Sequence, residues 1–406
     1  MSALTRKILL VWLGWAVVLI VYQEMIPARL VDVARPDYAV SWTFTETTHT
    51  SQLNKAFLVD PFLNTHVAWD SEFYLQQAVG GYSDERVRQI PGPEGMVSMG
   101  YAFYPFYGFT TRLLAFPLKV FGLDEIATAT LAGVLVSLLG TLAALLALAD
   151  MARPWLEESG RLRAAFYLLI FPSGFFLAQV YTEGLFLGLA FTSLALIRRE
   201  KLLWAGVLAA AAVWTRAVGV ALVIPLAWAV FEQIRDDKIA IIGRGTAMGG
   251  IAMLLPLASF AGFWFSPLGA NFRFLEANFF GRGFLLVGQS VAQWVSAVSD
   301  AFKANNSQAI VYNVIEIVIV VVSLAAALAL LRKYPGLALF SLAVWAISVF
   351  SGSPQSVSRY LLAMPTTFLA LAHLGKNEVF DRAWTVASVL VMGMMAALFS
   401  FDMWVG

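Results

Sequence analysis

Residues 125–150 read EIATATLAGVLVSLLGTLAALLALAD, an apolar run whose only charged side chains stand at its two ends. A helix of about 20 apolar residues is long enough to cross the roughly 30 Å hydrocarbon core of a bilayer. Apolar runs of the same kind, bounded by charged residues, recur along much of the chain. This repetition predicts an all-α polytopic membrane protein.

Eleven apolar runs qualify as candidate membrane spans. They cover residues 8–27, 125–150, 163–181, 183–198, 202–215, 217–231, 239–263, 308–331, 335–351, 358–374 and 382–402. The runs 202–215 and 217–231 are each too short to cross in a straight path. They therefore form either two spans or one helix broken around Arg216, and we expect a bundle of about eleven transmembrane helices.

The composition excludes several classes of protein. The chain is 60% hydrophobic and 13% charged, and a soluble domain has about twice that charged fraction. The net charge of +1 gives no basic field that would attract nucleic acid. The absence of cysteine excludes disulfides, thiolate metal sites and a cysteine nucleophile.

Lysine and arginine residues gather in the short loops on one side of the predicted spans. They are Arg6, Lys7, Arg153, Arg161, Arg163, Arg198, Arg199, Lys201, Arg235, Lys238, Arg332, Lys333, Lys376 and Arg382. The positive-inside rule makes that side cytoplasmic. Two long polar segments, 28–124 and 264–307, then face outward as loops of a single domain that covers residues 1–406.

The first outer loop, residues 28–124, is rich in aromatic and acidic residues. A dense aromatic load is typical of helices that lie at a membrane interface. We expect two or three juxtamembrane helices in this loop, and we expect residues 105–121 to lie along the outer leaflet.

The same loop contains the run THVAWDSEFY at residues 65–74. At helical spacing, four of its side chains share one face: His66, Asp70, Phe73 and Tyr74. A carboxylate among aromatic side chains, just outside the first span, suits general-base chemistry on a lipid-borne substrate. The alternative is that Asp70 caps a helix or hydrogen-bonds within its own loop.

Several short segments carry a resemblance to a known family. They are WDS at 69–71, FYPF at 103–106, FPSGFF at 171–176, YTEGLF at 181–186 and WTRAVG at 214–219. Together they resemble the PIG-V family, which comprises GPI mannosyltransferase II and its prokaryotic relatives among the GT-C membrane glycosyltransferases. The resemblance runs in order over residues 60–235. From about residue 240 on it is loose, apart from SRY at 358–360.

This resemblance implies a GT-C-type bundle whose donor is a polyprenyl- or dolichyl-phosphate-linked sugar, most simply mannose. It implies inverting transfer to a hydroxyl of a glycolipid, glycan or protein at the outer or lumenal face. Asp70 matches the acid of the family's first loop, which takes the acceptor proton. The membrane would be the plasma membrane in a prokaryote and the endoplasmic reticulum in a eukaryote, and a small membrane subunit is a possible partner.

Arginines within apolar surroundings are the candidate phosphate ligands. An arginine at membrane depth is unfavourable unless it faces a cavity or a partner, and its planar fork fits a phosphate. Arg216 and Arg359, the latter followed by Tyr360, meet this description, and Arg282 ranks behind them. The alternative for Arg216 and Arg359 is that their side chains reach out to lipid headgroups.

Glu183 is a second candidate acid at the outer boundary between two predicted spans. It is expected to pair with an arginine, although it could instead cap a helix or touch the sugar. The predicted substrate contacts are then Trp69, His66, Tyr181, Glu183, Arg216, Arg359 and Tyr360. The histidines lack a third ligand at metal spacing, so the sequence predicts no metal and no cofactor.

Two other classes of function fit the same sequence. A transporter or flippase of lipid-linked saccharides would share the many spans and the intramembrane arginines. A non-catalytic subunit of a glycosylation complex would also do so. The acidic aromatic loop and the Trp69-Asp70 pair favour an enzyme.

Overall fold

The computed structural model describes residues 2–29, 63–87, 89–93, 95–236, 240–241, 243–401 and 404–405. Within this part of the chain, six helices are long and apolar enough to cross a membrane. They are Ala3–Ile26 within α1 (Ala3–Arg29), α5 (Glu125–Met151), Ala217–Arg235, α10 (Arg244–Trp264), α13 (Ser307–Leu330) and α17 (Glu378–Ser400). These helices indicate an integral membrane protein.

The other predicted spans correspond to shorter helices. They are α6 (Glu158–Leu169), α7 (Glu183–Arg198), α8 (Leu202–Thr215), α14 (Pro335–Val349) and α16 (Pro365–Leu374). Eleven spans are therefore not shown. The apolar runs are longer than their helices because the backbone leaves helical geometry where proline or a polar turn interrupts them, as it does before Pro365 and after Val349.

The chain reverses direction at Arg216. That residue is extended, with φ −155° and ψ 137°, and η6 (Ala217–Leu222) and α9 (Val223–Arg235) follow it. A Cβ atom on Gly219 would lie only 2.7 Å from the carbonyl carbon of Ala212, so η6 lies directly against α8. The prediction of a single helix broken at Arg216 is therefore wrong, because the two segments lie alongside each other.

Close backbone packing fixes the helix that carries Glu183. A Cβ atom on Gly184 would lie 2.2 Å from the carbonyl oxygen of Ser137, so only glycine allows α7 to approach α5 this closely. Small residues at a helix crossing let dispersion contacts hold membrane helices together. The first turn of α7 is thereby held rigidly against α5.

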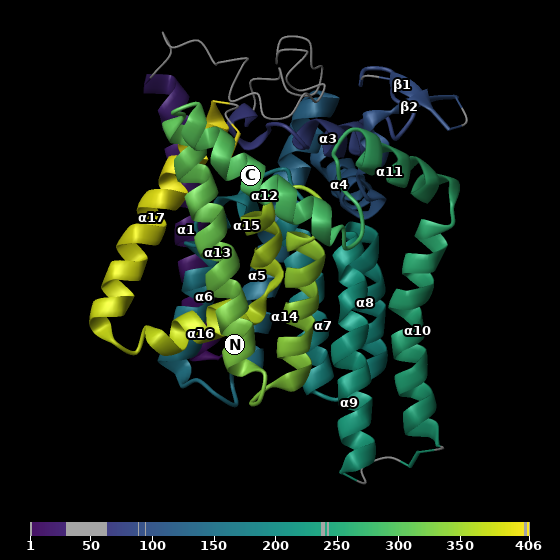
Figure 1. Cartoon of the computed structure of the whole chain (residues 1–406), viewed down its shortest axis with the longest axis vertical. Coiled ribbons are helices and arrows are strands. Elements are labelled where there is room, and N and C mark those ends of the chain that lie inside the picture. The colour runs from purple at the N-terminus through teal and green to yellow at the C-terminus, as the bar shows by residue number, and fades with distance from the viewer. Residues whose placement is uncertain are drawn as a thin grey trace.

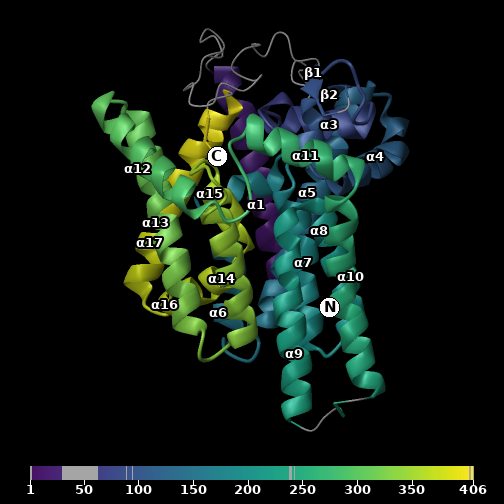
Figure 2. The same cartoon turned by 45° about the vertical axis from the view of Figure 1, so that its right-hand side comes forward.

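The basic loops gather at one end of the bundle. Lys7 pairs with Glu158 at 2.7 Å, and Arg198 pairs with Asp150 at 2.8 Å. At the opposite end from the α9–α10 connection lie α3 (Ser71–Val79), α4 (Pro105–Leu118) and α11 (Pro267–Asn278), as Figures 1 and 2 show. The two ends thus correspond to the predicted basic side and the predicted aromatic side.

The described part of the first outer loop is mostly helical, as expected, but it also contains strands. β1 (Gln89–Gly92) and β2 (Gly95–Ser98) form a two-stranded antiparallel hairpin, which the all-α prediction missed. The 3-10 helices η2 (Asn64–His66), η3 (Met99–Ala102) and η4 (Lys119–Phe121) complete this part. Residues 30–62 of the loop lie outside the described residues.

Candidate active site

Asp70 lies at a sharp turn immediately before α3. Trp69 adopts φ +52°, a left-handed conformation that is unfavourable for a bulky residue and that recurs at functional sites. The backbone N–H of Asp70 donates to the hydroxyl of Tyr181 at 3.2 Å, and that hydroxyl donates to the carbonyl of Ala68 at 3.0 Å. The Asp70 side chain makes no capping hydrogen bond to α3, so its carboxylate is available to the cavity beside it.

His66 does not share a helical face with Asp70, and that prediction is wrong. η2 ends at His66, and the left-handed turn at Trp69 separates it from α3. The imidazole is fully buried, and this burial lowers the pKa of His66 to about 4. Interactions with the backbone of Ala178 and the side chain of Gln179 act in the opposite direction and raise the pKa, but by less. The structure therefore places His66 beneath the site as a neutral side chain.

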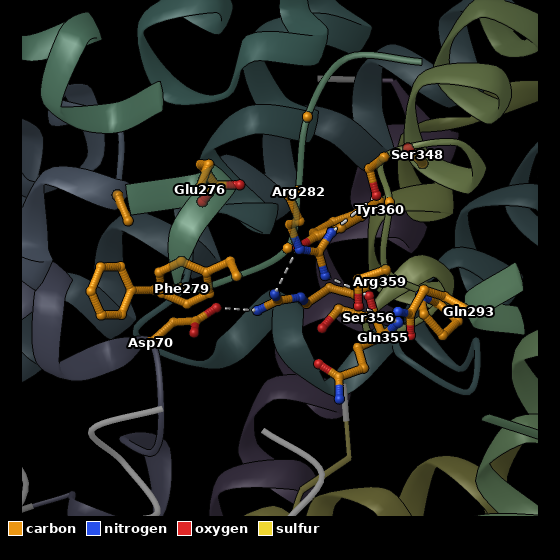
Figure 3. Close-up of a pocket in the computed structure, with 18 of the residues that line it drawn as sticks. Asp70, Glu276, Phe279, Arg282, Gln293, Ser348, Gln355, Ser356, Arg359 and Tyr360 are labelled. Atoms are coloured by element: carbon orange, nitrogen blue, oxygen red, sulfur yellow. Dashed lines mark hydrogen bonds and ion pairs between the residues drawn. The ribbon is translucent and has the colours of Figure 1, made fainter. Parts of the chain in front are cut away.

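Two carboxylates and two guanidinium groups form a connected ion-pair cluster. Arg359 Nη1 donates to Asp70 Oδ2 at 3.0 Å, as drawn in Figure 3, and Arg359 Nε lies 3.3 Å from Glu183 Oε1. Arg216 Nη1 donates to the same Glu183 oxygen at 2.5 Å. Glu183 is 1% exposed and Arg359 is 4% exposed, so neither charge is satisfied by bulk water. Glu183 thus holds both of the arginines predicted from the sequence.

The ring of Tyr360 brings a third guanidinium to this cluster. Its centroid lies 4.5 Å from Arg216, 5.1 Å from Arg282 and 5.2 Å from Arg359. Arg282 is fixed by its Nη2, which donates to the carbonyl of Gln355 at 2.7 Å. An aromatic face stabilises a cation that lies over it. Three arginines therefore share one ring, and among the described residues their carboxylate partners are Asp70 and Glu183.

A cavity of about 1440 Å³ opens over this cluster. Its lining includes five of the residues predicted as substrate contacts and also Asp70: Trp69, Asp70, Glu183, Arg216, Arg359 and Tyr360. His66 and Tyr181 are not part of the lining. Tyr181 instead lies under Arg359, with the guanidinium 4.9 Å from its ring centroid. Residues that are far apart in the sequence thus meet around one cavity.

Glu276 on α11 is a cavity-lining acid that the sequence analysis missed. Burial raises the pKa of Glu276 to about 7; Arg282 opposes this shift and the negative charge of Asp70 adds to it. Figure 3 shows Glu276 on the same side of the cavity as Asp70. No spacing in the sequence connects α11 with residue 70, because only the fold brings them together.

Glu316 on α13 holds the turn that carries Arg359. Its Oε2 accepts the backbone N–H of Ser358 at 2.6 Å, and its Oε1 accepts the Ser358 hydroxyl at 2.7 Å. The backbone N–H of Ser356 donates to the hydroxyl of Tyr312 at 2.9 Å. The short helix α15 (Val357–Tyr360) is thereby anchored to α13, with Arg359 directed toward Asp70.

No group of three or more histidine, aspartate or glutamate side chains is arranged to hold a metal ion in the described part of the chain. The expected absence of a metal and of a cofactor stays a prediction.

Comparisons with known proteins give only distant similarities. No protein-family model matches the chain, and no curated protein matches it. The crystal structure of ArnT from Cupriavidus metallidurans bound to undecaprenyl phosphate is similar at 14% identity and a TM-score of 0.45, over 86% of this chain and 74% of that one. The apo oligosaccharyltransferase of Archaeoglobus fulgidus is similar at 11% identity and a TM-score of 0.47, over 97% of this chain and 56% of that one.

A further structure, the archaeal oligosaccharyltransferase AglB from Archaeoglobus fulgidus with an inhibitory peptide and a dolichol-phosphate, gives a TM-score of 0.44 at 11% identity. The similarity covers 96% of this chain and 55% of that one, so the chain spans about half the length of this enzyme. Membership of the PIG-V family is not shown by these comparisons.

Proposed function

We propose that the protein is a membrane glycosyltransferase of the GT-C type. It transfers a sugar, most simply mannose, from a polyprenyl- or dolichyl-phosphate donor to an acceptor hydroxyl at the outer or lumenal face. The observation that carries this proposal is the meeting of a cavity-facing carboxylate, Asp70, with three clustered arginines in one cavity. The resemblance of residues 60–235 to the PIG-V family supports the same activity.

The arginine cluster suits a phosphate that carries a lipid. Guanidinium groups bind phosphate oxygens through charge-assisted, often paired hydrogen bonds. Arg216 and Arg359 already share Glu183, and Arg282 adds a cation without a salt-bridge partner among the described residues. An incoming phosphate would therefore enter a site in which the three arginine charges outnumber the carboxylate charges that contact them.

The transfer step needs one base and no general acid. The acceptor hydroxyl gives its proton to a carboxylate oxygen of Asp70 while its own oxygen forms a bond to the anomeric carbon. The bond from that carbon to the donor phosphate breaks on the opposite face, and the phosphate leaves with the electron pair. Because the second pKa of a phosphate is about 6, it departs as a stable anion, and the arginines stabilise its charge. The proton on Asp70 then passes to water.

The test is turnover by the purified full-length protein in nanodiscs with polyprenyl-phosphate-mannose. Asp70→Asn should lower release of polyprenyl phosphate by about 100-fold or more, the scale expected for loss of a general base. Donor binding should be retained, because the arginines remain. Glu85→Gln, an exposed acid in the same loop, is the matched control and should retain full activity.

Unchanged turnover in the Asp70→Asn protein would overturn the assignment of the base. Movement of the intact lipid-linked saccharide across vesicles, with no bond broken, would instead identify a flippase.

A further inference from the structure

We propose that one wall of the cavity is an acceptor subsite for an uncharged, polyhydroxylated group such as a neutral sugar. This wall, the amide wall, comprises the inward face of α12 (Val287–Lys303), the start of α13 and residues 351–356. The inference rests on the proposed function and names the class of acceptor that the enzyme uses.

The amide wall differs chemically from the rest of the cavity. Apart from Asp300, its polar lining residues are amides and hydroxyls: Gln289, Gln293, Ser296, Asn306, Gln308, Tyr312, Asn313, Ser351, Ser353, Gln355 and Ser356. The one charged side chain among its described lining residues is Asp300, which accepts a hydrogen bond from Ser296 at 2.8 Å. The cationic cluster and the carboxylates Asp70 and Glu276 belong to other walls.

Helix α12 contributes the most exposed part of this wall. Gln289, Gln293 and Ser296 recur at helical spacing on the face that lines the cavity. Val291 and Val295 are exposed on another face, at 52% and 66%. A helix with one apolar and one polar face is typical of the membrane interface. The wall is tied in place because Ser290 Oγ accepts the backbone N–H of Gly352 at 2.9 Å.

One amide nitrogen of this wall is left without a hydrogen-bond partner among the described residues. This atom is Gln308 Nε2, which is buried. The side chains of Gln293 and Gln355 point into the region beside Arg359 in Figure 3. A buried donor without a partner is unfavourable, so it marks a place where a ligand or water supplies the acceptor.

The chemistry of the amide wall selects a neutral polyol over charged acceptors. Each amide offers both donors and an acceptor, and so does each sugar hydroxyl, which gives matched pairs. An anionic acceptor would be drawn to the arginines and would compete with the donor phosphate. A cationic acceptor would find only Asp300 on this wall. The same headgroup chemistry is available from a glycolipid and from a soluble saccharide.

The experiment separates donor cleavage from transfer. The nanodisc protein is given polyprenyl-phosphate-mannose alone, to measure hydrolysis to water, and then with one acceptor probe at a time. The probes are octyl α-mannoside, methyl α-mannoside, octyl glucuronide and a serine-containing peptide. We expect transfer to the two uncharged mannosides, and their ratio shows whether the source is lipid-borne or soluble.

The variants are Gln293→Leu and Gln308→Leu, and the control is Val295→Ala on the exposed face. Each glutamine variant should raise the KM for the mannoside about tenfold, the effect of one lost hydrogen bond of about 1.4 kcal/mol. Hydrolysis of the donor should stay at the level of the unaltered protein, which also shows that the variants fold. The Val295→Ala protein should match the unaltered protein in both assays.

Preferential transfer to octyl glucuronide or to the peptide would overturn the inference, as would an unchanged mannoside KM in both glutamine variants. These outcomes leave donor cleavage intact and so differ from failure of the proposed function, in which no donor is cleaved in an Asp70-dependent way.

Discussion

Arg359 contacts both carboxylates of the ion-pair cluster, so under the proposed function its partners would change when a phosphate enters. Its Nη1 is bound to Asp70 at 3.0 Å, and its Nε lies 3.3 Å from Glu183. A phosphate that attracts Nη1 would release the Asp70 carboxylate at the moment when a base is needed. In the absence of donor, the resting ion pair would hold the Asp70 carboxylate in a fixed orientation.

We expect Arg359→Ala to raise the Kd for polyprenyl phosphate about 100-fold and Arg359→Lys about tenfold. The lysine keeps the charge but loses the planar fork that binds two oxygens. Binding of the radiolabelled lipid to the nanodisc protein measures both. Arg86→Ala is the control, because Arg86 lies in the same outer loop and pairs with Asp84 and Glu125 outside the cavity. Equal weakening by Arg86→Ala would argue against a specific phosphate site.

The raised pKa of Glu276 leads us to expect that donor binding depends on pH. Its pKa of about 7 means that it is largely protonated at pH 6 and largely ionised at pH 8. The ionised form adds a negative charge near Asp70, so the KM for the donor should rise as the pH increases through about 7. Glu276→Gln should hold the donor KM at its low-pH value throughout this range. Since burial lowers the pKa of His66 to about 4, His66 cannot produce this change. An unaltered pH profile in Glu276→Gln would contradict the assignment.

At the scale of elements, α13 and the turn at 356–360 act as one unit. The Glu316 carboxylate accepts hydrogen bonds from both the backbone N–H and the hydroxyl of Ser358, and Glu316 is 1% exposed. A buried carboxylate in a membrane helix is unfavourable unless its hydrogen bonds are satisfied, and here Ser358 provides them. Glu316 is therefore a positioning residue for Arg359.

Glu316→Ala should weaken donor binding about tenfold or more by releasing the Arg359 turn, whereas Glu316→Gln should retain most of it. The amide oxygen of glutamine still accepts a hydrogen bond from Ser358, so the turn stays anchored. Donor Kd is the measurement. If both variants lost donor binding to the same extent, the negative charge rather than the anchoring would be the cause.

The elements also show what a sequence can predict. Apolar runs bounded by charges predicted the long helices, because burial in lipid imposes that pattern directly. The sequence predicts that the helix is interrupted at Arg216. It does not predict that the chain reverses there, because the reversal depends on the packing of η6 against α8. The left-handed turn at Trp69 and the approach of Glu276 and Glu316 are tertiary features that leave no periodic signal. Asp70, Arg216 and Arg359 can be proposed as candidates from the sequence because they are charges in apolar or aromatic surroundings.

For the whole molecule, the decisive feature is the separation of its two ends. The basic loops gather at one end, and α3, α4 and α11 lie toward the other, as Figures 1 and 2 show. The lining of the cavity includes residues of α3 and α11. From the positive-inside rule we expect the cavity to face away from the cytoplasm. Under the proposed function, the donor would then present its sugar on the outer or lumenal side of the membrane.

The absence of cysteine makes this orientation directly measurable, because a single introduced cysteine is the only thiol in the chain. Ser83→Cys lies in the first outer loop and Lys333→Cys lies between α13 and α14, and both positions are exposed. In sealed cells or vesicles of native orientation, a membrane-impermeant maleimide should label Ser83→Cys at once and Lys333→Cys only after permeabilisation. Denatured protein, in which both cysteines react, calibrates full labelling. The reverse pattern would place the Asp70 carboxylate in the cytoplasm, where a donor with an exposed outer-leaflet sugar cannot reach it.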